Sequence, residues 1–320
     1  MGCLILFLDG VGLGDEDPDR NPLAAAPLPT LRRLLDGHAL TRSASQVGRF
    51  ASGFLLRPLD ATLGVPGLPQ SGTGQATLWS GVNVAAQLGR HSGPYAPPLA
   101  RDILQHTNLF RAARTRFVQA GAAFANAFPP RYLDRLARGT ARQSVTSLAA
   151  HLGGVPLRGQ DELARGEALS AYVTNELWAS RLGVPGMPTI TPREAGIHLA
   201  RLTQTHALTV FEYFATDMAG HRAEPEMALD VLGRLDGLLD GLLAALDPQR
   251  DLLLVTSDHG NLEDTTTTDH TLNPVPGLLW GAGAAEMATS LSSLVDVAPA
   301  VLHWLTRHTP RHESPAGQSG

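Results

Sequence analysis

The stretch that decides the fold is Cys3-Leu-Ile-Leu-Phe-Leu-Asp-Gly-Val-Gly12, an apolar run that ends in an aspartate and glycines. Six apolar residues in a row are too few for a membrane span and are typical of a strand covered on both faces. Asp9 follows directly, so its side chain should lie beyond the carboxyl end of this strand. Open α/β sheets bind their ligands at that edge. The run therefore predicts a parallel strand with a candidate functional carboxylate at its end.

Two more apolar runs end in a similar way. Residues 208–214 are followed shortly by Asp217, and Leu252–Thr256 is followed by Asp258 and His259. Because the carboxyl ends of parallel strands share one edge of a sheet, these side chains should meet there although they are far apart in the sequence. Two weaker strand candidates are residues 122–128 and 276–280.

Helical periodicity separates the strand candidates. It covers residues 28–35, 194–202 and 226–246, and residues 296–305 form a last predicted helix with Asp296 as its N-cap. Strands that alternate with helices imply right-handed crossovers and a sheet covered on both faces. The sequence therefore predicts an α/β sandwich with a mostly parallel central sheet.

The composition of the 320 residues excludes several functions. The 43% of apolar residues are enough for a sizeable core, and all 25 basic residues are arginine, as a GC-rich genome favours. Without lysine there is no Schiff base and no lysine-dependent phosphate loop, so arginine, metal, backbone amides or histidine must hold any anion. The net charge is −5, and no arginine stripe carries interleaved aromatic residues. These features argue against a nucleic-acid partner.

The single cysteine and the length of the apolar runs indicate in which cellular compartment the protein is expected. Cys3 is the one cysteine, which excludes an internal disulfide and a zinc site made of cysteines. No stretch approaches the ~20 apolar residues of a membrane span. We therefore expect a cytoplasmic protein without a membrane partner. After Arg307 the composition turns to proline, serine, glycine and histidine, so residues 308–320 are expected to form a flexible tail.

Carboxylates and imidazoles together indicate a metal site. Each residue alone also fits a helix cap, a turn or a surface pair. Together, carboxylates at one sheet edge repel one another unless cations lie among them, and oxygen and imidazole ligands suit zinc, manganese or iron. Six ligands suit two ions, which favour phosphoryl or sulfuryl transfer. The six candidates are Asp9, Asp217, His221, Asp258, His259 and His270.

A candidate nucleophile lies in Pro69-Gln-Ser-Gly-Thr-Gly-Gln-Ala-Thr77. Small hydroxyl residues between glycines, before an apolar helical stretch, can offer an oxygen and backbone amides to an anion. Taken alone, the segment also fits a flexible turn. It lacks the Gly-x-Ser-x-Gly pattern of a serine-hydrolase elbow, so a metal would have to activate the hydroxyl.

Taken together, these motifs resemble those of the alkaline-phosphatase superfamily. They are most similar to the branch that holds cofactor-independent phosphoglycerate mutase and phosphopentomutase, and the resemblance covers residues 1–92 and 195–306. It implies an alkaline-phosphatase-like three-layer sandwich. The motifs are Asp9-Gly-Val-Gly12, Ser71-Gly-Thr-Gly-Gln75, Asp217-Met-Ala-Gly-His221, Asp258-His-Gly-Asn261, and His270-Thr271 before Asn273-Pro-Val-Pro276.

The resemblance also implies roles for the site residues. Two divalent ions, manganese or zinc, would be bridged by the attacking hydroxyl, which becomes a phospho-enzyme. Ser71 would be this nucleophile, with Thr73 as the alternative, because the mutases carry Gly-His where Gly74-Gln75 stands. One ion would be held by Asp217, His221 and His270, and the other by Asp9, Asp258 and His259.

Departures from the family shape the functional expectation. Phosphoglycerate mutases of this type carry a long second domain and a lysine near the metals, whereas this chain has no lysine and leaves only residues 97–192 for a small inserted subdomain. We expect residues 1–96 and 193–307 to form the core. The expected function is phosphoryl transfer, as a phosphatase or phosphomutase, on a small phosphorylated metabolite. A phosphoglycerate mutase-like intramolecular transfer and a non-catalytic metal-binding relative are the alternatives. Formylglycine sulfatases are disfavoured, because residues 71–75 lack the proline and arginine of their motif.

Substrate contacts are expected from His91 and from arginines of the inserted region, above all Arg131 and Arg138, with Arg135 and Arg142 as further candidates. Arginine grips phosphate with two parallel hydrogen bonds, although a solvated helix face or loop packing explains the same residues. A dinucleotide-binding oxidoreductase is a further class, suggested by Gly10-x-Gly12-x-Gly14. The spacing differs from that of the dinucleotide motif, and Asp9 would face the pyrophosphate.

Overall fold

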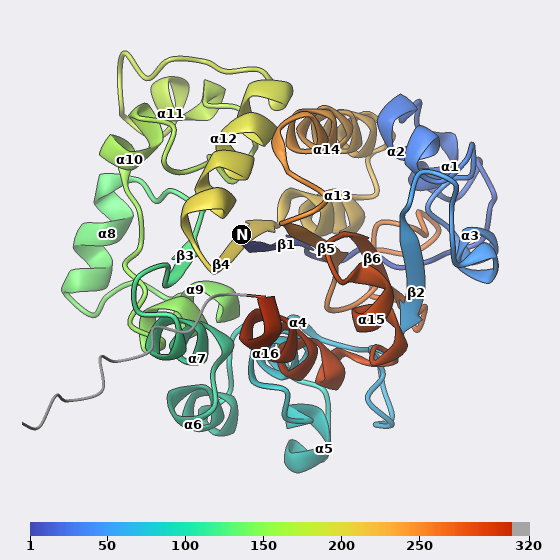
Figure 1. Cartoon of the computed structure of the whole chain (residues 1–320), viewed down its shortest axis with the longest axis horizontal. Helices are drawn as coiled ribbons and strands as arrows, with labels where there is room; N and C mark the ends of the chain where they lie inside the picture. Colours follow the sequence, from blue (N-terminus) through green and yellow to red (C-terminus); the bar gives the residue numbers. More distant parts are fainter. Residues whose placement is uncertain (309–320) are drawn as a thin grey trace, which may run out of the picture.

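A six-stranded sheet separates two layers of helices in residues 1–308, the part of the chain that the computed structural model describes (Figure 1). The strands are β1 (Cys3–Leu8), β2 (Leu55–Leu59), β3 (Ala122–Phe124), β4 (Leu208–Tyr213), β5 (Leu252–Thr256) and β6 (Val275–Gly281). Their order across the sheet is β2-β6-β5-β1-β4-β3. Strands β3, β4, β1 and β5 run parallel, while β6 is antiparallel to β5 and β2 is antiparallel to β6. The predicted α/β sandwich with a mostly parallel sheet is confirmed.

The helices form two layers and a group beside the sheet. One layer contains α1 (Pro22–Ala25), α2 (Pro29–Leu34), α3 (Arg42–Val47), α12 (Pro192–Thr205), α13 (Ala215–Arg222) and α14 (Pro225–Ala245). The opposite layer contains α4 (Ser71–Ser80), α5 (Val84–Leu88), α6 (Pro98–His106), α7 (Leu109–Arg116), α9 (Val145–Leu152), α15 (Ala284–Thr289), the 3-10 turn η1 (Leu294–Asp296) and α16 (Val297–His308). Beyond the β3 edge lie α8 (Pro130–Ala137), α10 (Gln160–Ala164) and α11 (Glu176–Ser180) (Figure 1).

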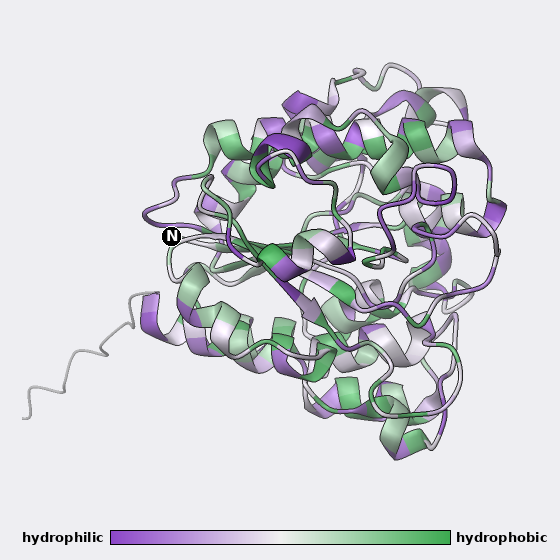
Figure 2. Ribbon diagram, turned by 90° about the vertical axis from the view of Figure 1, so that its right-hand side faces the viewer, coloured by the Kyte–Doolittle hydropathy of each residue, from purple (hydrophilic) through white to green (hydrophobic). Residues whose placement is uncertain are grey.

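Strand β1 explains why the deciding stretch is apolar at every position. Alternate side chains of a strand point to opposite faces. Cys3, Ile5 and Phe7 pack in the core under the α4 layer, while Leu4, Leu6 and Leu8 pack in the core under α12 and α14. Viewed from the side, the sheet crosses the molecule between the two helical layers (Figure 2). The buried strand therefore holds the residue that follows it, Asp9, in a fixed position.

One strand was missed because its sequence contradicts the pattern that revealed the others. Strand β2 reads Leu-Leu-Arg-Pro-Leu, and Arg57 and Pro58 are exposed. Proline has no N–H to donate to a sheet and is therefore confined to edge strands. Strand β2 is the last strand at its edge of the sheet, where its neighbouring strand is β6. The weak candidate at 122–128 is shorter than expected, since β3 ends at Phe124.

Residues 97–192, where a small inserted subdomain is expected, contribute to two parts of the molecule. The first part of this region supplies β3 to the main sheet, and the Phe110 ring lies 5.7 Å from Trp79 of α4 and 6.2 Å from Phe124. The second part has a small hydrophobic cluster of its own around Trp178 and Leu163. The expected boundary at residue 97 therefore does not coincide with a break in the core.

The C-terminal helix is present, but its start differs from the expectation. The carboxylate of Asp296 accepts hydrogen bonds from the backbone N–H groups of Ser292 and Ser293, so it does not cap the helix that follows. Helix α16 includes His308, which was expected to begin the tail, and residues 309–320 lie outside the described residues. Within residues 1–308, no helix has the length and apolar character needed to cross a bilayer.

Candidate metal centre and nucleophile

The structure brings the three strand-end aspartates together. Asp9 follows β1, Asp217 lies in the first turn of α13 after β4, and Asp258 lies two residues after β5. Gly10 makes this approach possible. It has a φ of +68°, and a Cβ placed on it would lie 2.5 Å from Oδ1 of Asp217. A side chain here would be strained and would push Asp217 away, so the position after Asp9 requires glycine.

The first candidate ligand group consists of Asp9, Asp258 and His259. Nε2 of His259 lies 3.6 Å from Oδ1 of Asp9 and 3.4 Å from Oδ2 of Asp258. Asp258 and His259 are fully buried, and Asp9 is 8% exposed. Oδ1 of Asp9 and Oδ2 of Asp258 have no hydrogen-bond partner in the described part of the chain. Buried carboxylate oxygens without a partner are costly, and a cation between them would satisfy them.

The second predicted ligand group is Asp217, His221 and His270, whereas the ligand atoms that lie close enough together to share an ion belong to Asp217, His259 and His270. Nε2 of His221 lies 3.3 Å from Oδ2 of Asp217, and Nε2 of His270 lies 3.8 Å from Oδ1 of Asp217. The two Nε2 atoms lie 3.2 Å apart. The His259 ring stacks on the His270 ring with a centroid distance of 3.7 Å, so the two groups adjoin each other.

Backbone carbonyls set the tautomers of these histidines. Nδ1 of His221 lies 2.8 Å from the carbonyl of Thr268, and Nδ1 of His270 lies 2.6 Å from the carbonyl of Pro69. A carbonyl only accepts, so each Nδ1 carries the proton, and in a neutral ring each Nε2 carries a lone pair. Two lone pairs 3.2 Å apart repel unless a proton or a metal ion lies between them. Metal-bound histidines in proteins have this second hydrogen bond at the other ring nitrogen. The donor set therefore fits divalent cations.

Burial and neighbouring charges shift the pKa values of three candidate ligands so that the uncharged forms are favoured. Burial, followed by the carboxylates of Asp258, Asp217 and Glu212, raises the pKa of Asp9 well above its usual value. Burial also raises the pKa of Asp258. Burial, with a smaller effect of His270, lowers the pKa of His259 to about 3. These carboxylates lack a positive partner, which a metal ion would supply.

Ser71 lies at these groups and Thr73 does not. Ser71 is the first residue of α4, and its Oγ lies 3.0 Å from Nε2 of His259. The hydroxyl of Thr73 donates to the carbonyl of Gln70 at 3.2 Å and accepts from the N–H of Ser92 at 3.2 Å. Thr73 is fully buried. Of the two candidate nucleophiles, the Ser71 hydroxyl is therefore the one that contacts a candidate metal ligand.

Three supporting residues were not singled out from the sequence. Glu263 is 2% exposed and accepts hydrogen bonds from the N–H groups of Gly12 and Asn261 and from the hydroxyl of Thr271. It thereby ties together the loops after β1 and β5 and the loop that carries His270. Asn261, part of a quoted motif, donates to Oδ1 of Asp217 at 2.7 Å. The third residue is Gln75 of α4, whose side-chain amide donates to Oδ2 of Asp9 at 3.3 Å.

A pocket of about 490 Å³ opens beside Ser71, Asp9 and Asp217. It reaches over the β3 edge, and its walls carry aromatic residues. Arg142 lies at this pocket, with its guanidinium carbon 5.3 Å from the centre of the Tyr95 ring.

Of the predicted substrate residues, Arg142 lines this pocket, whereas His91, Arg131 and Arg138 do not. Arg131 and Arg138 are exposed, in α8 and directly after it, and are not among the residues that line this pocket. His91 contacts the carbonyl of Val65 through Nε2 at 3.2 Å and does not line the pocket either.

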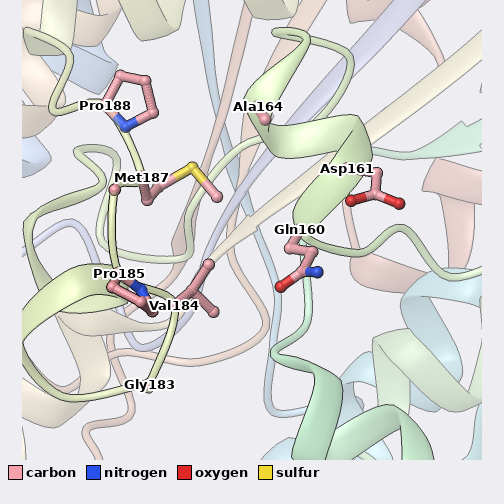
Figure 3. A pocket seen from close by; sticks show the side chains of 9 residues that line it. Gln160, Asp161, Ala164, Gly183, Val184, Pro185, Met187 and Pro188 are labelled. Carbon is pink, nitrogen blue, oxygen red and sulfur yellow. The ribbon is translucent and has the colours of Figure 1, made fainter.

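A second pocket, of about 380 Å³, lies between α10 and the loop at residues 183–188 (Figure 3). In Figure 3, Val184, Pro185 and Met187 lie on one side and Gln160 on the other. Asp161 is the one ionisable side chain among its lining residues. This pocket therefore lacks the groups that metal-assisted chemistry needs.

Comparison with known proteins locates the sequence similarity in the second half of the chain. Residues 193–308 match the family model of the metalloenzyme superfamily. The 2,3-bisphosphoglycerate-independent phosphoglycerate mutase of Dinoroseobacter shibae is 36% identical over 129 residues, which are 38% of this chain and 25% of the mutase. The corresponding mutase of Roseobacter denitrificans is 35% identical over 121 residues, 35% of this chain and 24% of the mutase. The matched stretch thus spans about a quarter of these relatives.

Comparison with solved structures covers nearly the whole chain. The PH0037 protein of Pyrococcus horikoshii superposes with a TM-score of 0.56 and 12% identity, over 98% of this chain and 99% of that protein. A cold-active alkaline phosphatase of Shewanella superposes with a TM-score of 0.50 and 13% identity, over 95% of this chain and 100% of the phosphatase. At these identities, the likeness concerns the fold. It agrees with the resemblance that the sequence motifs indicated.

The match of residues 193–308 also contains five of the six candidate metal ligands, and these are Asp217, His221, Asp258, His259 and His270. The fold and this match together confirm the resemblance: residues 193–308 match the metalloenzyme superfamily, and the chain has an alkaline-phosphatase-like fold.

Proposed function

We propose that this chain is a two-metal phosphoryl-transfer enzyme that acts on phosphate monoesters through Ser71. The observation that carries the proposal is the position of the Ser71 hydroxyl, 3.0 Å from Nε2 of His259, where the two ligand groups adjoin. Two ions 3.5–4 Å apart are a common arrangement for in-line displacement at phosphorus. The family match supports a metalloenzyme.

We assign three side chains to each of the two ions. Asp9, Asp258 and His259 would hold one ion through two carboxylates and Nε2. The other ion would be held through one carboxylate and two Nε2 atoms, by Asp217, His221 and His270. When bound, manganese or zinc ions would neutralise phosphoryl oxygens and lower the pKa of the nucleophilic hydroxyl.

The chain itself contributes position and orientation. Ser71 begins α4, so the N–H groups of Ser71 and Gly72 lie beside its hydroxyl, where they favour an anion, whereas the N–H of Thr73 already donates to the carbonyl of Ser92. The Ser71 hydroxyl loses its proton to solvent and its Oγ attacks the phosphorus, the bond between phosphorus and the alcohol oxygen breaks, the alcohol leaves with a proton from solvent, and the phosphoryl group remains on Ser71. A water molecule then takes the phosphoryl group from Ser71. Gln75 and Asn261 hold Asp9 and Asp217 in place during both steps through their amide N–H groups.

The test combines metal content with turnover. We expect the purified protein to contain two divalent ions per chain and to hydrolyse a phosphate monoester. Replacing Ser71→Ala should lower turnover by about 10³-fold or more, as loss of a nucleophile does in other hydrolases. Thr73→Ser is the matched control, because it retains the buried hydroxyl, and it should stay near the wild-type rate. If Ser71→Ala left turnover unchanged in the metal-loaded protein, the proposal would be wrong.

Intramolecular transfer, as in a mutase, is the second candidate, and the identity to two phosphoglycerate mutases favours it. A product assay separates the two. Release of inorganic phosphate indicates hydrolysis, whereas an isomeric phosphate ester without release indicates a mutase. A non-catalytic relative would show neither product, whatever its metal content.

A further inference from the structure

The pocket beside Ser71 has a composition that points to a particular leaving group. Six of its twenty lining residues are aromatic, whereas aromatic residues make up 5% of the chain. Three of the four tyrosines of the chain line it. The six are Tyr95, Phe128, Tyr132, Tyr172, Trp178 and Phe214.

These rings come from separate segments and converge on one space. The Phe128 and Tyr132 rings stack at 5.0 Å with an interplanar angle of 20°; Phe128 lies between β3 and α8, and Tyr132 lies in α8. On another wall, Tyr172 and Phe214 meet edge to face at 5.7 Å. Flat faces and edges of this kind bind another aromatic ring better than they bind a sugar or a short acid, because stacked and edge-to-face contacts add to the burial of apolar surface.

Arg142 and Tyr95, at the rim of the pocket, add to the surface that a substrate ring can contact. The guanidinium of Arg142 lies over the Tyr95 ring, and the backbone carbonyl of Arg142 accepts a hydrogen bond from the Tyr132 hydroxyl at 3.1 Å. Tyr95 is also close to the nucleophile, since its backbone carbonyl contacts the space that a side chain on Gly72 would occupy. Ser71 and Tyr95 both line this pocket.

The charges of the pocket argue against a substrate with a second anionic group. Within the described residues, Arg142 is the one basic residue among those that line it, although the chain has 25 arginines. Three carboxylates, of Asp9, Glu212 and Asp217, face the same space. The bound ions would offset those near Ser71. A carboxylate or a second phosphate on the alcohol would meet few positive partners.

We propose, as a consequence that rests on the proposed function, that the substrate is a phosphate monoester whose alcohol carries an uncharged aromatic ring. The ring binds among Tyr95, Phe128 and Tyr132 while the phosphoryl group lies at Ser71. The volume of about 490 Å³ lies within the range of small-molecule sites and leaves room for one or two fused rings. On this account, the small acid of the phosphoglycerate mutases is a poor substrate.

The experiment uses phosphate esters of primary alcohols, so that the acidity of the leaving alcohol stays similar. Benzyl phosphate supplies the ring, methyl phosphate lacks it, and 3-phosphoglycerate adds a carboxylate. With the metal-loaded wild-type enzyme, we expect kcat/KM for benzyl phosphate to exceed that for methyl phosphate by about tenfold or more, as burial of an apolar group in a fitted pocket provides. We expect 3-phosphoglycerate to fall below methyl phosphate.

Variants of Tyr132 show whether this pocket is responsible. Tyr132→Ala should lower kcat/KM for benzyl phosphate by about fivefold to tenfold, mainly through KM, and should reduce the ratio of the benzyl phosphate value to the methyl phosphate value. Tyr132→Phe retains the ring and should keep the preference. Equal kcat/KM values for benzyl and methyl phosphate in the wild type, or a preference for 3-phosphoglycerate, would overturn the inference.

A binding measurement separates this inference from the proposed function. Benzylphosphonate and methylphosphonate carry no ester bond, so calorimetry with the metal-loaded protein reports the ring alone. Tighter binding of benzylphosphonate without any turnover of esters would support the aromatic site and contradict the phosphoryl-transfer function. Turnover of esters with equal binding of the two phosphonates would leave the function standing and contradict the aromatic site.

Discussion

Oγ of Ser71 lies 3.0 Å from Nε2 of His259, although 188 residues separate the two in the sequence. Ser71 begins a helix of one layer, and His259 follows a central strand of the sheet. Gly74 allows the helix to approach, because a Cβ there would lie 3.0 Å from the carbonyl oxygen of Asp258. The nucleophile and the candidate ligands are therefore held by the packing of α4 against the sheet edge.

His221 is the most exposed candidate ligand, with 46% of its side chain accessible, so it can be removed without opening the core. We expect His221→Ala to reduce the metal content from two ions per chain to one, because the second group would retain only Asp217 and His270. Mass spectrometry of the metal content of dialysed protein measures this. His106→Ala, which removes an exposed histidine of α6, is the control and should keep both ions. Retention of both ions by His221→Ala would contradict the assignment of this ligand.

Glu263 connects the loops that carry the ligands, so its replacement should affect stability before chemistry. In Glu263→Gln one carboxylate oxygen becomes an NH₂ group that faces donors, and hydrogen bonds from Gly12, Asn261 or Thr271 are lost. Loss of buried hydrogen bonds to a charged group should lower the free energy of unfolding by about 2–4 kcal/mol. Urea denaturation of metal-free protein measures the change. The exposed Glu226→Gln should be neutral, and equal stabilities of the two variants would show that Glu263 has no such role.

The buried Glu212 makes the free energy of unfolding depend on pH, and a substitution of Glu212 can measure its contribution. Burial raises its pKa from the usual 4.5 to about 7. Between these values the folded protein holds the proton that the unfolded chain has lost, so the free energy of unfolding falls as the pH rises from 4.5 to 7 and then levels off. At about 1.4 kcal/mol per pKa unit, the loss amounts to about 3 kcal/mol.

The variant Glu212→Gln tests this sign, because an amide stays neutral. We expect metal-free Glu212→Gln to lose less stability between pH 5 and pH 8 than the metal-free wild type, which retains the same Asp9 and Asp258. Urea denaturation at both pH values measures the difference, and Glu226→Gln should behave like the wild type. Parallel pH profiles of the wild type and Glu212→Gln would contradict the raised pKa of Glu212.

Variants of two predicted arginines test whether a position in the pocket matters. Arg142 lines the pocket, whereas Arg138 does not. Arg142→Ala removes the cation over Tyr95, which at an exposed site corresponds to about a twofold to fivefold loss. We expect this loss in kcat/KM for benzyl phosphate and little change for methyl phosphate. Arg138→Ala should change neither value, since Arg138 does not line the pocket. A larger effect of Arg138→Ala would restore the expectation drawn from the sequence.

The sequence predicted the parts of the molecule in which local pattern and burial agree. The continuous apolar runs identified β1, β4 and β5 because parallel strands are covered on both faces. The rule that parallel strand ends share an edge placed Asp9, Asp217 and Asp258 at one edge from residues far apart in the chain. The histidines followed because two of them neighbour those aspartates in the sequence.

Features that depend on long-range packing could not be predicted in this way. Strand β2 carries Pro58 and forms only because β6 offers it a partner on one side. Glu263 looks like an ordinary loop glutamate until Gly12 and Thr271 are brought to it from other parts of the chain. The aromatic pocket draws its rings from several segments that are far apart in the sequence. Arg131 and Arg138 were chosen by residue type, which does not reveal the direction of a helix face.

The most direct test is to locate the phosphoryl group on the enzyme. Metal-loaded protein is mixed with benzyl phosphate, quenched in acid during turnover, digested and mapped by mass spectrometry. The account predicts phosphate on Ser71 and none in the Ser71→Ala variant. Phosphate on Thr73 instead, or rapid turnover with no phosphorylated peptide at any quench time, would contradict it.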